Sequence, residues 1–165
     1  NLEAGSEERL PLVFGEYKCS TPVAMGITPD DAFSFVTCGE SFDIYKIDNS
    51  QKNIVGRIEF TKGEFPGPIQ TPVHPNGKYL YVPDMRNGIV HKIDVNNFEL
   101  IKDVKSGSGA HGVAFSGDGK TAYVTNTWEN TVSAIDLESD NVVKIIAVGS
   151  KPNGVANTNG KNQGW

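Results

Sequence analysis

Residues 110–150 read AHGVAFSGDGKTAYVTNTWENTVSAIDLESDNVVKIIAVGS and contain one unit of a repeat that recurs along the chain. It contains four short apolar runs separated by turn residues, and each run predicts a strand, at 111–115, 121–125, 131–135 and 142–148. Asp118-Gly119, between the first two runs, supplies the positive φ angles that a tight hairpin needs. The stretch therefore predicts a four-stranded antiparallel meander.

Composition agrees with an all-β chain. The 165 residues include 18 glycines and 9 prolines and almost no uninterrupted run at helical spacing, which indicates many turns and many strands. No apolar run approaches the ~20 residues that span a bilayer, so no transmembrane segment is expected. The formal net charge is −5 and the 15 Lys and Arg residues are scattered, which disfavours a nucleic-acid partner.

The rest of the chain consists largely of imperfect copies of residues 110–150. Sliding it back by 42 residues places Asp136 on Asp94, and a further 46 places Asp94 on Asp48. A period in the low forties with four strands per unit is typical of a β-propeller blade. We predict one partial propeller domain over residues 1–165, with three complete blades at 22–67, 68–109 and 110–151. The repeated aspartates are expected to accept backbone hydrogen bonds in the following turns.

Two segments remain outside the blades. Residues 10–17 predict an outermost strand, and residues 152–156 predict an innermost strand, each without the rest of its blade. Three blades leave sheet edges and faces that need partners. The chain is therefore expected to be part of a longer propeller or to be completed by other polypeptides. Its start at Asn1 fits either a processed secretory protein or a piece of a longer chain.

The sequence Tyr123-Val124-Thr125-Asn126, preceded by Gly119-Lys120 and followed by Asn130-Thr131-Val132 and Ile135-Asp136, resembles the YVTN type of β-propeller repeat. The resemblance covers about 22–156 and weakens towards the N-terminus. It implies that the first strand of each blade lines a central channel and that the fourth lies outside. The family includes surface-layer proteins, and similar propellers form the heavy subunits of amine dehydrogenases and the d-type haem domain of nitrite reductases.

Cys19 and Cys38 are the only cysteines. In a blade, the loop that enters the first strand and the loop that leaves the second lie on the same face. The two Cα atoms are therefore expected within the ~4.4 to 6.8 Å that a disulfide requires. A disulfide implies an oxidising compartment, periplasmic or extracellular. The alternative is a pair of buried free thiols. The absence of a CxxC or Cys/His cluster in the sequence disfavours structural zinc.

His111 opens the first strand of the third blade, and its equivalents are Val23, Ile69 and Asn153, so the repeat does not demand a histidine there. In the haem-binding and quinoprotein propellers that the chain resembles, the ligand lies at this end of the channel. The resemblance therefore makes His111 the one candidate for cofactor binding, although the cofactor itself is unknown and polar residues are common in that position. The other two histidines, His74 and His91, are expected at the surface.

Loops on the same face as His111 are the expected binding rim, because a sheet scaffold tolerates variation there. They comprise 61–67, 84–87 and 127–129, with Phe65, Arg86 and Trp128 as candidate partner-binding residues. A plain solvated rim is the alternative.

Two functions follow. The first is a non-catalytic binding or scaffold module of a secreted or periplasmic protein. The second is part of a periplasmic oxidoreductase propeller of the amine dehydrogenase or d-type haem kind, with the site at the channel mouth. A visible absorption spectrum of the purified protein distinguishes them.

Overall fold

The computed structural model describes residues 9–61 and 66–157, and its regular structure there is entirely β. The strands are short, and most have six or seven residues. Their bounds are β1 (Val13–Phe14), β2 (Tyr17–Lys18), β3 (Pro22–Ile27), β4 (Phe33–Cys38), β5 (Asp43–Asp48), β6 (Asn53–Glu59), β7 (Tyr79–Asp84), β8 (Ile89–Asp94), β9 (Glu99–Lys105), β10 (Ala110–Phe115), β11 (Thr121–Asn126), β12 (Thr131–Asp136) and β13 (Asn141–Ala147).

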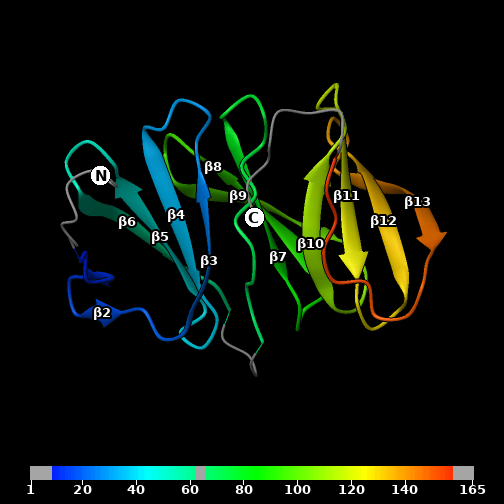
Figure 1. The fold of residues 1–165 in the computed structure, drawn as a ribbon, viewed down its shortest axis with the longest axis horizontal. Coiled ribbons are helices and arrows are strands. Elements are labelled where there is room, and N and C mark those ends of the chain that lie inside the picture. Colours follow the sequence, from blue (N-terminus) through cyan, green and yellow to red (C-terminus); the bar gives the residue numbers. More distant parts are fainter. Residues whose placement is uncertain (1–8, 62–65, 158–165) are drawn as a thin grey trace, which may run out of the picture.

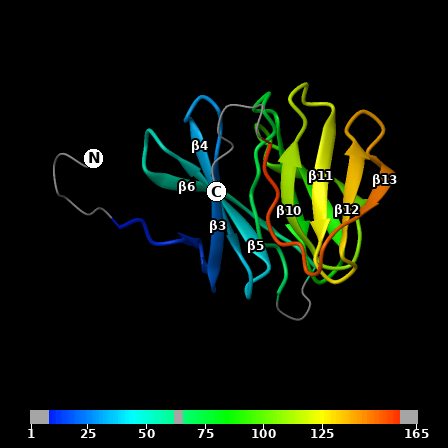
Figure 2. The same cartoon turned by 45° about the vertical axis from the view of Figure 1, so that its right-hand side comes forward.

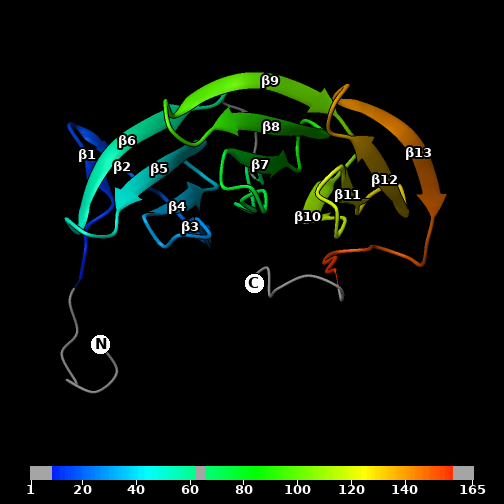
Figure 3. The same cartoon turned by 90° about the horizontal axis from the view of Figure 1, so that it is seen from above.

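Strands β3 to β13 form three antiparallel sheets that stand side by side (Figure 1), and β1 and β2 form a small sheet of their own. We name them blade 1 (β3-β4-β5-β6), blade 2 (β7-β8-β9 with the segment before β7) and blade 3 (β10-β11-β12-β13). Seen from above, the blades follow an arc, with the outer strands β6, β9 and β13 along its convex side (Figure 3). This is an open portion of a β-propeller, as the sequence predicts. All four strands expected in residues 110–150 are present, as β10 to β13.

Blade 2 differs from the expectation of four regular strands. Its first strand is reduced to two isolated bridges, Pro68 with Asp84 and Val73 with Leu80. Proline has no N–H to donate, so Pro68 and Pro72 interrupt the ladder that the segment would otherwise form with β7. The segment still occupies the inner position, because Tyr81 N donates to Pro72 O at 3.1 Å.

The two end segments also differ from the single strands expected. Within residues 10–17 the chain turns at Gly15 (φ 62°) and forms the hairpin β1–β2, which continues to Lys18 and whose first strand lies against β6. Residues 152–156 form no strand, but they run back along β10, as Figure 2 shows in red. Thr125 Oγ1 donates to Asn153 O at 2.8 Å, so this segment does take the place of an inner strand.

Cys19 and Cys38 are joined by a disulfide, with the two Cα atoms 5.5 Å apart. The bond ties the segment after β2 to the end of β4. The repeat accounts for the proximity, since Gly107 and Asn126 in blade 3 have the same separation (126 − 107 = 19). There, a Cβ on Gly107 would lie only 2.6 Å from the Asn126 side chain.

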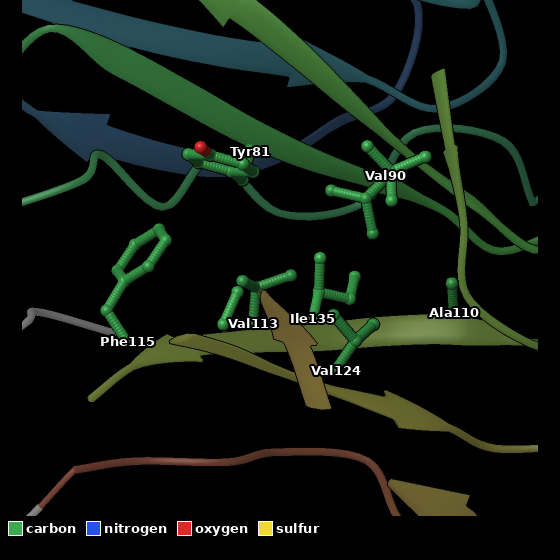
Figure 4. Packing of buried hydrophobic residues seen from close by; sticks show 9 residues of the cluster. Tyr81, Val90, Ala110, Val113, Phe115, Val124 and Ile135 are labelled. Atoms are coloured by element: carbon green, nitrogen blue, oxygen red, sulfur yellow. The ribbon is translucent and has the colours of Figure 1, made fainter. Parts of the chain in front are cut away.

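Each blade buries its face against the next, and this packing forms two separate cores. Between blades 1 and 2 the core consists of Phe35, Ile44, Phe60, Val73, Leu80, Val82, Ile93 and Val95. Between blades 2 and 3 it consists of Tyr81, Val90, Val104, Ala110, Val113, Phe115, Ala122, Val124 and Ile135. Figure 4 shows side chains of the two blades directed toward one another in this core. The two-residue period of β7 sends Leu80 and Val82 towards blade 1 and Tyr81 towards blade 3.

The inner strands approach most closely at Gly26. A Cβ at this position would overlap the carbonyl oxygen of Thr71 in the next blade. Nearby, Thr37 Oγ1 donates to Ile69 O at 2.8 Å, which repeats the Thr125 to Asn153 contact in blade 3. Blade 2 has Pro83 at the equivalent position, which offers no hydroxyl.

Each end face of the arc lacks a neighbouring blade. Met25 and Ile27 on β3 are 56% and 46% exposed, whereas their equivalents in blade 3, Val113 and Phe115, are buried against blade 2. At the other end, Tyr123 is the equivalent of Tyr81 but lies outside the core between blades 2 and 3. Both end faces therefore carry the residue pattern of a surface that packs on another blade.

The repeated aspartates hold the turns between third and fourth strands, as predicted. Asp48 Oδ1 accepts Ser50 N and Gln51 N, both at 2.9 Å, and Asp136 Oδ1 accepts Ser139 N at 2.8 Å. These turns also repeat a positive φ four residues later, 52° at Lys52 and 55° at Asp140. The carboxylates stabilise a conformation that non-glycine residues seldom adopt.

We expect Gly26→Ala to lower the free energy of unfolding by roughly 1 to 3 kcal/mol, because the added methyl group forces the inner strands of blades 1 and 2 apart. Gly149→Ala is the matched control, since a Cβ there meets nothing within 4 Å. Denaturant unfolding of both variants measures the difference. Equal midpoints would show that the close approach at Gly26 does not limit the packing.

We expect Asp136→Ala to destabilise the chain at neutral pH and to lose this effect in acid. Hydrogen bonds from the Ser139 hydroxyl and backbone N–H hold the pKa of Asp136 below its ordinary value. The stabilisation is therefore complete above the unfolded-state pKa of about 4 and is lost as the pH falls through the folded-state value. Unfolding midpoints measured from neutral to acidic pH test this, with exposed Glu99→Ala as the control. A difference that persists undiminished at low pH would contradict it.

Candidate binding rim

The loops between second and third strands gather on one face of the arc, together with the segments that enter each first strand. This face contains the Gly39–Phe42, Met85–Gly88 and Thr127–Asn130 turns. Phe65, a predicted member of the rim, lies outside the described residues. Blades 2 and 3 build the part of the rim that carries the other two predicted residues, Arg86 and Trp128.

Arg86 and Trp128 come together on this rim. Arg86 follows β7 in blade 2 and Trp128 follows β11 in blade 3, and the Arg86 Cζ lies 5.9 Å from the centroid of the Trp128 ring. A guanidinium over an aromatic face at this distance is a cation–π contact. The structure thus places two of the predicted partner-binding residues side by side, on different blades.

The backbone beneath Trp128 is held by hydrogen bonds. Trp128 N donates to Ser108 O at 3.2 Å, and Thr127 N donates to Gly109 O at 2.9 Å. Gly109 has φ 78°, and a Cβ there would lie 3.0 Å from the Trp128 ring, so only glycine fits below the indole. The ring is nevertheless 46% exposed. It is a fixed aromatic surface presented to solvent.

His111 is half-buried in an irregularity of the β10–β11 ladder, between Ala110 and Val113. Its Nδ1 is buried without a hydrogen-bond partner. Burial lowers the pKa of His111, and the backbone of Asn153 offsets part of this effect, so the ring is neutral near pH 7. Among the described residues, no group of three or more His, Cys, Asp and Glu side chains is arranged to hold a metal ion.

The expectation that His74 and His91 lie at the surface is wrong. His74 is buried between blades, where its Nε2 lies 2.8 Å from Gly119 O and its ring meets Phe115 edge-on. His91 is buried on β8, stacked on Phe60 at 4.1 Å. Each ring packs against an aromatic side chain of a neighbouring blade, a contact that a single histidine in a strand pattern does not reveal.

His91 connects a buried carboxylate to an exposed one. Its Nδ1 lies 2.6 Å from Asp103 Oδ1, and its Nε2 lies 3.5 Å from Asp84 Oδ2, longer than a hydrogen bond. Burial raises the pKa of Asp84, but the His91 ring and the Asn87 donors outweigh burial and leave the pKa below its ordinary value. The sequence reasoning missed this group. The repeat offered one signal, because Asp84 replaces Cys38 and Asn126 at the end of a second strand.

Among the residues that the structure describes, no helix is long and apolar enough to span a membrane.

The family of YNCE-like beta-propellers matches residues 17–161, and the chain belongs to this family. Among solved structures, hydrazine synthase from Kuenenia stuttgartiensis is similar, with 23% identity and a TM-score of 0.73 over 86% of this chain and 41% of that one. A structure titled U3-55K is similar with 16% identity and a TM-score of 0.72, over 86% of this chain and 42% of that one. A functionally unknown protein from Desulfotomaculum acetoxidans gives 17% identity and a TM-score of 0.72, over 84% and 46%.

No curated protein matches the chain. The chain spans less than half the length of these solved structures. At these identities the likeness shows the propeller fold and no activity. A partial propeller of this kind is completed by further blades or by other chains, in agreement with the exposed end faces.

Proposed function

We propose that this chain is a binding and scaffold part of a propeller that works in the periplasm or outside the cell, and that a protein partner docks on the Trp128 rim. The observation that carries this proposal is the Arg86–Trp128 pair, which joins two blades and rests on a fixed backbone. Trp and Arg are enriched among the residues that dominate binding energy at interfaces. A partner needs an apolar face for the indole and oxygen acceptors for the guanidinium.

The disulfide supports the compartment. Cys19–Cys38 joins two positions that are 19 residues apart in the sequence and anchors the hairpin segment to blade 1. Such bonds persist in oxidising compartments and are rare in the cytosol.

A preformed rim loses little conformational entropy when a partner binds, because the backbone below Trp128 is already held by hydrogen bonds.

Trp128→Ala is expected to weaken binding at the rim by at least about tenfold, and Arg86→Ala by a similar factor. Peptides selected from a random display library on the oxidised 165-residue chain provide the probe, and titration of each variant measures the affinity. Tyr17→Ala is the matched control. Tyr17 is equally exposed (46%) and also carries an arginine, with the Arg57 Cζ 4.0 Å from its ring centroid.

Binders whose affinity falls for Trp128→Ala but not for Tyr17→Ala support the rim. Equal losses for both variants, or no loss for either, would show that partners do not use the Trp128 rim.

A further inference from the structure

Equivalent residues of different chemistry occupy the tips of the three rim turns. Glu40 in blade 1 is followed one repeat later by Arg86 in blade 2 (86 − 40 = 46) and a further repeat later by Trp128 in blade 3 (128 − 86 = 42). All three side chains are exposed. Because the blades follow an arc, this tip row presents an acidic, a basic and an aromatic side chain in that order (Figure 3).

A second row on the same face repeats the order at the ends of the outer strands. The last residues of β6, β9 and β13 are Glu59, Lys105 and Ala147. Each of them pairs with the first residue of the third strand in its own blade, so the three lie at the same level. All three are exposed. This outer row is therefore also acidic in blade 1, basic in blade 2 and uncharged in blade 3.

The turn below Glu40 is fixed by a covalent bond. Cys38, two residues before Glu40, is joined to Cys19. The residue after Cys19 is Ser20, whose Oγ donates to Glu40 Oε2 at 2.7 Å. Side-chain hydrogen bonds from Thr21 and Ser20 lower the pKa of Glu40, so the carboxylate is charged at neutral pH. The acidic end of the tip row is thus held in place in the free protein.

A buried carboxylate fixes the turn below Arg86. Asp84 Oδ1 accepts a hydrogen bond from Asn87 N and Asp84 Oδ2 accepts one from Asn87 Nδ2, both at 2.9 Å. The carboxylate therefore spans the turn that carries Arg86. Hydrogen bonds also hold the backbone below Trp128, so all three tips project from ordered turns. Side chains on ordered turns leave little backbone entropy to be lost when a partner binds.

Two other charged groups lie near these rows and are directed elsewhere. Glu129, next to Trp128, lies against Gly107, where a Cβ would come within 2.7 Å of the Glu129 Oε2 atom. Arg57 approaches Glu59 at 3.4 Å, but its closer partner is the Asp43 carboxylate, at 2.7 Å. Blade 1 therefore offers the rim two carboxylates, and blade 2 offers it two cations.

We propose that the partner at the rim is an extended polypeptide segment that carries a basic side chain over Glu40, an acidic side chain over Arg86 and an apolar side chain against Trp128. The inference rests on the function proposed above and adds the chemistry of the partner. An extended chain gains about 3.3 Å per residue, so a short segment can reach turns on three blades. Opposite charges steer a partner into place and like charges exclude wrong ones. Glu40 and Arg86 thus set specificity, and Trp128 anchors the segment.

The test uses peptides selected by display on the oxidised 165-residue chain, restricted to those whose affinity falls for Trp128→Ala and which therefore bind the rim. We expect Glu40→Gln to weaken their binding by about two- to fivefold, the range of exposed ion pairs, and Glu40→Lys by about five- to tenfold. Glu99→Lys makes the same charge change at the opposite end of β9 from the rim and is expected to leave the affinity unchanged. The losses at Glu40 are expected to shrink at high salt, because exposed charges are screened.

A charge exchange between peptide and protein identifies the pairing. The basic residue of a selected peptide is replaced by glutamate, and we expect this peptide to bind the Glu40→Lys protein more tightly than the wild-type protein. A peptide whose acidic residue is replaced by lysine is expected to prefer Arg86→Glu in the same way. Glu40→Gln keeps the size of the side chain and an oxygen acceptor, so it tests the site even if Glu40→Lys disturbs the turn.

The outcomes separate this inference from the function on which it rests. Peptides that depend on Trp128 but bind Glu40→Gln and Glu40→Lys as tightly as Glu99→Lys would overturn the charge order and leave the Trp128 rim intact. Peptides that are indifferent to Trp128, Arg86 and Glu40 alike would overturn both proposals. Losses at Glu40 that the charge-exchanged peptides restore would support the proposed order.

Discussion

The structure depends on the burial of each blade's face against the next. No blade is thick enough to enclose a core, so the apolar side chains of β7 are divided between two neighbours, with Leu80 directed to one and Tyr81 to the other. The inner strands must approach closely for this packing, which explains a glycine at position 26 opposite Thr71 O. For the same reason, the first and last faces of the arc have no neighbouring blade to cover their apolar side chains, as the exposure of Met25 shows for the first face.

Much of the fold could be predicted from the sequence, because turn residues and apolar alternation recur at a fixed period. The strands of blade 3, the aspartates of the turns and the Cys19–Cys38 pair all follow from that repeat. The repeat did not predict the short hairpin β1–β2 or the broken first strand of blade 2. At these two places the turn at Gly15 and the missing N–H of Pro72 override the repeat pattern. A period identifies equivalent positions, but each position's own residue decides its hydrogen bonds.

The candidate site was predictable only in part, for the same reason. Rim loops follow from topology, so Arg86 and Trp128 could be named, but their contact across two blades depends on turn geometry. Function in a repeat protein is expected where equivalent positions diverge, because the shared residues are occupied with holding the blades together.

Because each end face carries the residues that other blades bury, we expect another blade or another chain to cover both faces in the complete propeller. Sedimentation equilibrium of the oxidised 165-residue chain at micromolar concentration tests this expectation. Self-association or precipitation is expected, since apolar faces that are buried between blades elsewhere in the arc are left in water here. A compact monomer that unfolds in one cooperative transition would show that the end faces need no partner.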